Sequence, residues 1–386
     1  MSDPSDLKAF DLSRERGFLP DQDPARSLPA ALGRWDELAA DLPKLLTAGR
    51  VRDALRALPV LELAALSGEA QLRRAMLVLS YFGHAWVWGG AEPDGVIPAG
   101  VAVPWCAVAA RLGRPPVLSY ASYALDNWRR LDPSGPLELG NLAILQNFLG
   151  GADEDWFILV HLEIEARAAR VLRELGPAGA AALSRDERGL AARLEEIASG
   201  IESLCQSLHR MPELCDPYVY YRRVRPYIHG WKDHPSLPDG VVYEGVRELA
   251  GPQRFRGETG AQSGIVPALD AALGVTHADD PLRSYLAEMR DYMPRGHREF
   301  LGALEASAPV RGAVLASSDP DLRAAYDDCL RWLESFRSTH LDYAARYIHQ
   351  QRPTGAANPT AVGTGGTPFM AYLRKHRDET GRHRTA

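Results

Sequence analysis

Cysteine is scarce in this sequence and is not arranged for any of its usual structural tasks. The 386 residues contain four cysteines, and no two of them form a CxxC pair. Zinc knuckles, disulfide scaffolds and covalent haem attachment through CxxCH all require closely spaced cysteines, so the sequence signals none of the three. Isolated thiols fit a reducing compartment, and we therefore expect a cytoplasmic protein.

Long apolar runs and an excess of positive charge are also missing. No uninterrupted apolar stretch reaches the length of about 20 residues that a membrane-spanning helix needs. The N-terminus has no basic start followed by an apolar segment. The formal net charge of −6 argues against a surface built to bind phosphate backbones. We expect no membrane span, no secretory signal and no nucleic-acid partner.

What the sequence does contain is the composition of a globular protein, with 46% apolar and 24% charged residues. Apolar residues recur at intervals of three and four in "LGRWDELAADLPKLL", "EAQLRRAMLVLSYFGHAWVW" and "LAARLEEIASGIESLCQSLHR". Alternating strand-like runs are scarce, and breaks rich in proline and glycine separate the helical segments. The pattern predicts an all-α fold.

Two loops divide the chain. The glycine pair in "LGGADED" is the preferred domain boundary, which gives a small N-terminal helical domain over residues 1–149 and a large helical domain over 150–386. Residues 351–367, "QRPTGAANPTAVGTGGT", combine proline with glycine, alanine and threonine, and we expect them to form a mobile loop. The helix expected after this loop would return it to the body of the protein, as a lid requires.

One candidate ligand lies on an amphipathic helix near the C-terminus. In "FRSTHLDYAARYIHQ", residues 336–350, His340 shares a stripe with Phe336 and two tyrosines, and Arg337 lies one turn before it. The stripe is expected to face inward, where His340 is either a hydrogen-bonded core residue or a ligand of a metal or haem iron. A lone imidazole on a long helix suits haem iron, and a nearby arginine can pair with a haem propionate.

Other common metal sites need ligands that this sequence does not supply. It has no HExxH motif, no two histidines four residues apart and no histidine-rich loop, and its 11 histidines are spread singly. A metal held by one axial histidine needs a macrocycle for its remaining ligands. Haem meets that need.

The segment "DPYVYYRRVRPYIHGW", residues 216–231, interleaves three arginines with tyrosines. Arg222 and Arg223 are expected to form a solvated basic face. Arg225 falls five residues after Tyr220 at the expected end of a helix, so both side chains can face one cavity. There the aromatic ring would cover a ligand while the guanidinium binds a carboxylate with two hydrogen bonds.

The segment "RFRGETGAQSGIVPALDAALGV" runs from a glycine- and threonine-containing loop into a helix. Such a loop offers backbone N–H groups to an anion or a polar head group, although it matches neither a Walker motif nor GxGxxG. Asp270, in the helix, is either an exposed acid or a partner for the second nitrogen of a ligating histidine.

Polar side chains interrupt two further apolar helices. "YASYALDNW" contains Tyr120 and Tyr123, and "WFILVHLEIEA" contains His161. Taken alone, each of these groups is most simply a hydrogen-bonded residue of the core. The glycine-rich "GTGG", residues 363–366, is equally compatible with a linker and with a closing lid.

The combination of these segments resembles the indoleamine 2,3-dioxygenase family of haem enzymes over nearly the whole chain. "AVPWCAVAARLGRPPVLSYASYALDNW", "DPYVYYRRVRPYIHGWKD", "GAQSG", "FRSTHLDYAARYI" and "GTGGT" occur in the family's order and at similar separations. The resemblance implies an all-α fold with non-covalent haem b in the large domain. It also implies oxidative opening of the pyrrole ring of L-tryptophan with O2 as co-substrate, after an unidentified reductant has primed the ferric haem.

The resemblance implies roles for individual residues. His340 would be the proximal iron ligand, Arg337 a propionate partner and Asp270 the proximal-side acid. Arg225 would bind the carboxylate of the substrate. The other residues expected to contact the substrate are Tyr120, Tyr123, Phe157, His161, Tyr220, Thr259, Gly260 and Thr364.

The chain departs from the family pattern at several of these positions. Many members carry serine where this chain has His161, and phenylalanine where it has Tyr220; "GETGA" replaces a loop richer in serine and glycine. These changes predict a more polar pocket. A distal histidine resembles the arrangement in tryptophan 2,3-dioxygenases, where it can accept the indole N–H. We therefore take His161 and Arg225 as candidate catalytic residues.

Two other functions are compatible with the same residues. One is a haem-dependent monooxygenase or hydroxylase of an aromatic amino acid or indole in secondary metabolism, with His161 as acid or base. Its product would gain one oxygen atom instead of two. The other is a haem-binding sensor or carrier that has no catalytic turnover.

Overall fold

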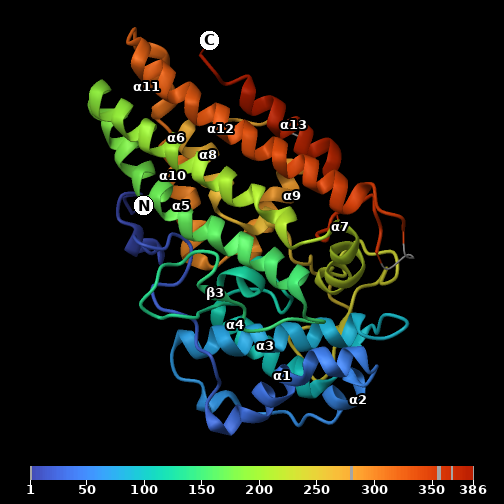
Figure 1. The fold of residues 1–386 in the computed structure, drawn as a ribbon. Helices are drawn as coiled ribbons and strands as arrows, with labels where there is room; N and C mark the ends of the chain where they lie inside the picture. Colours follow the sequence, from blue (N-terminus) through green and yellow to red (C-terminus); the bar gives the residue numbers. More distant parts are fainter. Residues whose placement is uncertain (1, 279–280, 354–357, 367, 386) are drawn as a thin grey trace.

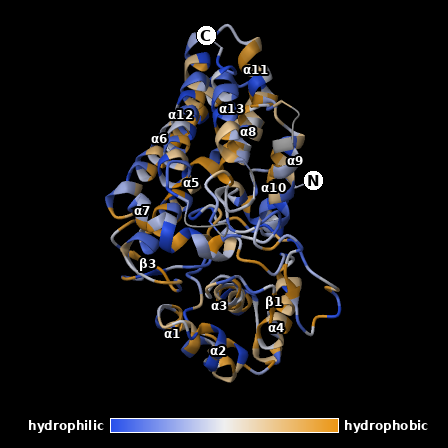
Figure 2. Cartoon of the chain, turned by 90° about the vertical axis from the view of Figure 1, so that its right-hand side faces the viewer, coloured by the Kyte–Doolittle hydropathy of each residue, from blue (hydrophilic) through white to orange (hydrophobic). Residues whose placement is uncertain are grey.

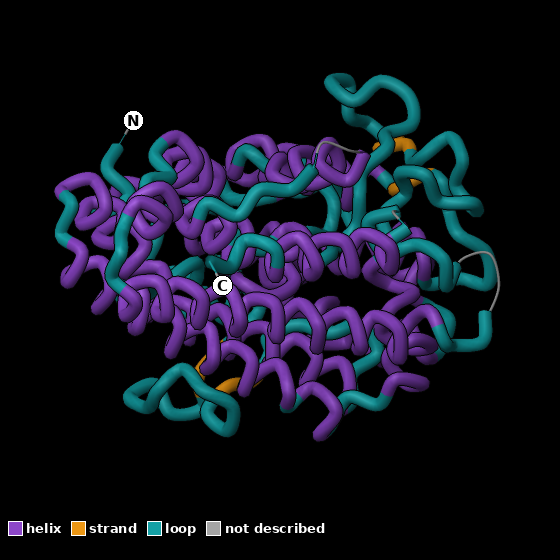
Figure 3. Tube along the Cα trace, turned by 90° about the horizontal axis from the view of Figure 1, so that it is seen from above, coloured by secondary structure: helices purple, strands orange, loops and turns teal. Residues whose placement is uncertain are grey.

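The computed structural model describes residues 2–278, 281–353, 358–366 and 368–385, and helices dominate all of these parts (Figures 1 and 3). The α-helices are Gly33–Thr47 (α1), Val51–Arg56 (α2), Glu69–Trp88 (α3), Ala99–Leu112 (α4), Ala152–Ser184 (α5), Glu187–His209 (α6), Pro217–Val219 (α7), Ile265–Leu273 (α8), Pro281–Met289 (α9), Arg295–Ala306 (α10), Val310–Ala316 (α11), Pro320–Ala344 (α12) and Phe369–Gly381 (α13). The all-α prediction is confirmed.

The strands of the described residues are only two residues long. Val96–Ile97 (β1) pairs in parallel with Val242–Tyr243 (β4), and Arg129–Arg130 (β2) pairs in antiparallel fashion with Leu142–Ala143 (β3). Both pairs fasten loops to the helices and neither forms a layer of the fold (Figure 3).

Two large apolar clusters, beside a smaller one around Tyr120 and Trp128, organise the helices of the described residues. One lies around α1 to α4, the blue and cyan part of Figure 1, and the other lies around α5, α6, α8, α10, α11 and α12. The N-terminal residues Leu7, Phe10 and Phe18 pack into the second cluster. The domain boundary between residues 149 and 150 stays a prediction, because the first cluster also contains residues from beyond it, such as Ile228, Trp231 and Tyr243.

The start of α5 follows from its local sequence. Gly150 and Gly151 adopt φ values of 70° and 104°, a region that favours glycine, and they turn the chain sharply into the helix. Glu154, in the first helical turn, accepts backbone hydrogen bonds from Leu149 at 3.1 Å and Gly150 at 2.9 Å. Acidic residues at this end also complement the helix dipole.

The long helices α5, α6, α12 and α13 run side by side (Figure 1). Their apolar stripes face one another, as the spacing of three and four predicts. Helix α3 is different, because it is apolar on nearly all sides and lies at the centre of the N-terminal helices (Figure 2). A helix that is hydrophobic all round is a buried one. Complete burial of each large apolar side chain contributes about 1.5–3 kcal/mol.

Three single π-helical turns interrupt the regular helices. They span Ala121–Leu125, Tyr220–Val224 and Ala345–His349. Such turns insert one residue and rotate the side chains that follow, and they are frequent at functional sites. Each of the three borders residues that the sequence analysis singled out. None of the helices in the described ranges has both the length and the apolar character needed to cross a membrane.

His84, in the middle of α3, is a buried histidine whose two nitrogens both bind backbone. Its Nδ1 donates to the carbonyl of Tyr227 at 2.8 Å, and its Nε2 accepts the N–H of Leu118 at 2.9 Å. Burial lowers the pKa of His84 to about 3 from 6.5. The folded protein therefore holds this imidazole neutral, and it joins three separate segments of the chain.

We expect the free energy of unfolding to decrease as the pH falls from about 6.5 towards 3. Over this range the unfolded chain binds a proton at His84 that the folded chain excludes, so stability is lost on acidification. His84→Ala should cost about 2–4 kcal/mol at neutral pH and should reduce this pH dependence. Urea unfolding at several pH values measures both effects. The exposed His209→Ala is the control, and equal pH slopes in the two variants would refute the assignment.

Candidate active site

A cavity of about 330 Å³ lies among α5, α8, α12 and α13 and the loops that join them. Most of its wall is apolar or aromatic. Ten of the twelve residues that the sequence analysis assigned to a site line it: Tyr120, Phe157, His161, Tyr220, Thr259, Gly260, Asp270, Arg337, His340 and Thr364. The other two, Tyr123 and Arg225, are buried next to the cavity but do not line it.

His340 projects from α12 into this cavity. Its side chain lies inside the protein, yet much of its surface is uncovered because it faces the empty space. It makes no hydrogen bond to any other described residue. Burial, with a smaller contribution from His161, lowers the pKa of His340 to about 4. A neutral imidazole with an available lone pair is the form that binds a metal.

Arg337 and Asp270 form an ion pair beside His340, with Nη2 and Oδ2 2.6 Å apart. Asp270 also accepts from His277 at 3.2 Å, and Arg337 donates to the hydroxyl of Thr380. Burial opposes ionisation of Asp270, but the charge of Arg337 and the hydrogen bond with His277 outweigh burial and lower its pKa. Asp270 therefore binds Arg337 and His277, and it makes no hydrogen bond with His340.

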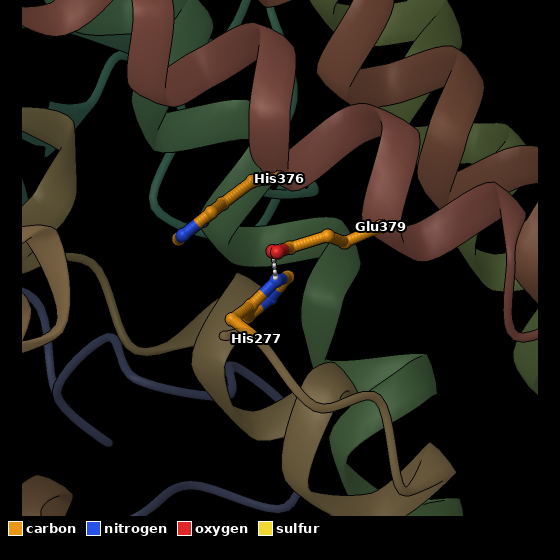
Figure 4. A group of neighbouring side chains, drawn as sticks. All are labelled: His277, His376 and Glu379. Atoms are coloured by element: carbon orange, nitrogen blue, oxygen red, sulfur yellow. Dashed lines mark hydrogen bonds and ion pairs between the residues drawn. The ribbon is translucent and has the colours of Figure 1, made fainter. Parts of the chain in front are cut away.

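His277 extends this network to α13 (Figure 4). Its Nδ1 lies 2.7 Å from Oε2 of Glu379, and its ring stacks on that of His376 with centroids 3.9 Å apart. Two imidazoles and a carboxylate are suitable metal ligands by type. However, both nitrogens of His277 lie within hydrogen-bond distance of carboxylate oxygens, at 2.7 Å and 3.2 Å, so both are already engaged. The sequence analysis missed this group because His277 is 102 residues from Glu379 in the chain.

His161 lines the cavity from α5. Its Nδ1 donates to the carbonyl of Phe157 at 2.7 Å, which leaves Nε2 as a hydrogen-bond acceptor. Burial lowers its pKa. The rings of Phe157 and Tyr120 lie 4.6 Å and 6.1 Å from the imidazole. His161 is thus a neutral, oriented acceptor within an aromatic wall.

The neighbouring aromatic residues are ordered in layers. Tyr220 packs on Phe157 with ring centroids 4.6 Å apart, and both line the cavity. Tyr123 lies one layer further out, 6.3 Å from Phe157 and from Tyr81. Its position supports the wall from behind.

Arg225 is fully buried at the edge of the site. Its Nη2 donates to the carbonyl of Val362 at 2.6 Å, and its Nη1 donates to the side chain of Asn358. Both partners belong to the loop over residues 351–367. The guanidinium therefore holds the loop in this conformation, and its Nε has no partner.

The same loop contacts the opposite side of the site. The Thr364 hydroxyl donates to the carbonyl of Glu258, and Arg256 donates to the carbonyl of Gly365 at 2.6 Å. Gly363 and Thr364 complete the cavity wall. Residues 354–357 and 367 of the predicted mobile loop lie outside the described residues.

The loop that carries Thr259 and Gly260 is fixed by a close backbone approach. A Cβ atom on Gly257 would lie 2.3 Å from the carbonyl oxygen of Ile228, and one on Gly230 would lie 2.1 Å from the nitrogen of Gly257. Only glycine fits at either position. This approach also directs Glu258 to the cavity wall, a residue that the sequence analysis did not single out.

The donor set of the cavity fits a haem. A histidine with an uncovered imidazole extends into it, broad apolar and aromatic surfaces flank the histidine, and Arg337 can pair with carboxylates. His161 and His376 line the same cavity, but both are less exposed to it than His340.

Comparison with known proteins places the chain in a family. A family model described as "Indoleamine 2,3-dioxygenase" matches residues 6–383. Indoleamine 2,3-dioxygenase 1 of Rattus norvegicus is 36% identical, covering 97% of this chain and 94% of that protein. Indoleamine 2,3-dioxygenase 2 of Homo sapiens is 33% identical, with coverages of 98% and 95%, and indoleamine 2,3-dioxygenase of Saccharomyces cerevisiae is 33% identical, with coverages of 97% and 92%. This chain belongs to the indoleamine 2,3-dioxygenase family.

Proposed function

We propose that this protein is a haem-dependent dioxygenase that opens the pyrrole ring of L-tryptophan or a related indoleamine with O2. The product would be of the N-formylkynurenine type. Family membership supports the reaction class. The observation that carries the residue assignments is the placement of two neutral histidines, His340 and His161, on one largely apolar cavity.

In this proposal His340 holds the iron of haem b, and Arg337 pairs with a haem carboxylate. The ion pair between Arg337 and Asp270 fixes the guanidinium for that contact. When bound, the haem supplies the iron at which O2 is activated. The proximal residues set where the haem lies, and they take no part in proton transfer.

The remaining residues position the indole. Phe157 and Tyr220 pack together against it and exclude water, while Nε2 of His161 accepts the indole N–H. Arg225 binds the carboxylate of an amino-acid substrate after exchanging a contact with the loop for it. Because its ring and its side chain are both fixed, the substrate is held in the orientation that the reaction requires.

The reaction class is tested by reducing the holoenzyme anaerobically, adding L-tryptophan and O2, and measuring the mass of the product. We expect a ring-opened product that has gained two oxygen atoms, with the absorbance of N-formylkynurenine. A product that has gained one oxygen atom would favour the monooxygenase alternative. A protein that retains haem but gives no product from any indole would favour the alternative of a haem-binding sensor or carrier.

His161→Phe should lower kcat/KM for L-tryptophan roughly tenfold, because one hydrogen bond of about 1–1.5 kcal/mol is lost. An N1-methylated tryptophan has no N–H to donate, so its kcat/KM should change little. Steady-state kinetics with both substrates measures the difference. Because burial lowers the pKa of His161, its Nε2 in the wild-type protein should remain a hydrogen-bond acceptor below pH 6.5. Equal losses for both substrates would show that the ring of His161 only fills space.

A further inference from the structure

Glu258 is a buried carboxyl group on the wall of the cavity. The residue is 4% exposed, and its side chain makes no hydrogen bond or ion pair with any other described residue. Its neighbours on the wall include Tyr120 and Tyr220, whose hydroxyl pKa values are raised mainly by burial and to a smaller extent by the Glu258 carboxylate. A carboxylate kept in such a place without a partner is costly.

The other charged residues that line the described cavity do not relieve this cost. They are Asp270 and Arg337, which pair with each other at 2.6 Å. Arg225 lies nearby, but two of its nitrogens are bound to the loop and it does not line the cavity. Among the described residues that line the cavity, Glu258 is thus the one carboxyl group that has no cationic partner.

The backbone of Glu258 is held on both sides, so the carboxyl cannot easily turn out to solvent. Its N–H donates to the carbonyl of Ile228 at 3.1 Å, and its own carbonyl accepts from Thr364. The close approach of Gly257 to Gly230 fixes the preceding residue. Desolvation raises the pKa of this carboxyl to about 8, as expected for a buried acid that has no cation beside it.

We propose that Glu258 is a specificity-determining residue that binds the ammonium group on the side chain of the substrate. The preferred substrates are then indoles with a protonated aminoalkyl arm, whether or not that arm also carries a carboxylate. This inference rests on the proposed function to the extent that the cavity receives an indole. In this arrangement Glu258 binds the ammonium group of the substrate and Arg225 binds its carboxylate.

Binding measurements can test this contact separately from catalysis. Isothermal titration of the ferric holoenzyme would compare tryptamine, which has the ammonium alone, with indole-3-propionate, which has the carboxylate alone. The titrations would be run at about pH 8.5, above the pKa of Glu258 and below that of an alkylammonium. The variants are Glu258→Gln and the control Glu165→Gln, which removes a buried carboxyl that binds Tyr120 and Ser263 and does not line the cavity.

We expect the wild-type protein to bind tryptamine more tightly than indole-3-propionate. Glu258→Gln should weaken tryptamine binding roughly 10- to 100-fold, as expected for loss of a charge-assisted hydrogen bond, and should leave indole-3-propionate binding unchanged or tighter. Glu165→Gln should keep the wild-type preference. Equal binding of the two ligands by the wild-type protein, or an unchanged preference in Glu258→Gln, would overturn the inference.

The outcome for Glu258 is independent of the outcome for the reaction. If L-tryptophan is not opened but the ammonium preference depends on Glu258, the reaction is wrong and the contact stands. If L-tryptophan is opened and the preference is absent or insensitive to Glu258, the reaction stands and the contact is wrong.

Discussion

His340→Ala is expected to abolish turnover and to yield protein that purifies without a Soret band. The imidazole of His340 faces the cavity and makes no hydrogen bond to another described residue, whereas His161 is bound through Nδ1 to Phe157 and the ring of His376 stacks on His277. Haem content from the absorbance spectrum and the rate of ring opening measure the two losses. His349→Ala removes an exposed histidine of the turn that follows α12 and should retain both haem and activity.

The fold should survive this substitution. His340 makes no hydrogen bond to other described residues, so alanine leaves no buried polar partner unsatisfied. Circular dichroism of the two apo proteins should therefore agree. A His340→Ala variant that keeps a wild-type Soret band, or that loses its helical spectrum together with its haem, would contradict the assignment.

Arg225→Leu should raise KM for L-tryptophan roughly 10- to 100-fold while the haem content stays the same. A hydrogen bond between a guanidinium and a carboxylate contributes about 1.5–3 kcal/mol, and this substitution removes it. Arg222→Leu, three residues earlier on an exposed face, is the matched control and should leave KM near the wild-type value. Steady-state kinetics and absorbance spectra provide both measurements.

The same variant also releases the loop, because Arg225 binds Asn358 and Val362 in this structure. Tryptamine separates the two effects, since it lacks the carboxylate but still requires a closed site. We expect the loss in kcat/KM to be larger for L-tryptophan than for tryptamine. Equal losses of kcat/KM for the two substrates would show that Arg225 only holds the loop. An unchanged KM for L-tryptophan would show that Arg225 does not bind the substrate.

The sequence was sufficient to predict the helices and the inward direction of the His340 side chain. Apolar spacing of three and four determines which face of a helix is buried, and His340 lines the cavity from α12. The glycine pair before α5 likewise marks a turn that other residues adopt poorly. These features depend on local sequence, so local reasoning finds them.

The contacts of the site depend on segments far apart in the chain, and the sequence could not supply them. Glu258 reaches the cavity because two glycines bring distant backbones together, and its charge matters because no partner lies nearby. Asp270 on α8 binds Arg337 on α12 and His277 in the loop that follows α8. Helical spacing gives no information on any of these distances.

Arg225 illustrates the same limit. Its separation from Tyr220 suggested that both side chains face one cavity, but a π-helical turn lies between them and only Tyr220 lines the cavity. The extra residue of such a turn changes the direction of every side chain after it. No residue in "YYRRV" signals the change.

The sharpest test of His340 as the iron ligand is chemical rescue. His340→Gly apo protein would be titrated with haemin in the absence and presence of imidazole, with the Soret band as the readout. We predict little specific uptake without imidazole, and a spectrum close to that of the wild-type protein when imidazole is added. A wild-type spectrum without imidazole, or a spectrum that imidazole leaves unchanged, would show that another group holds the iron.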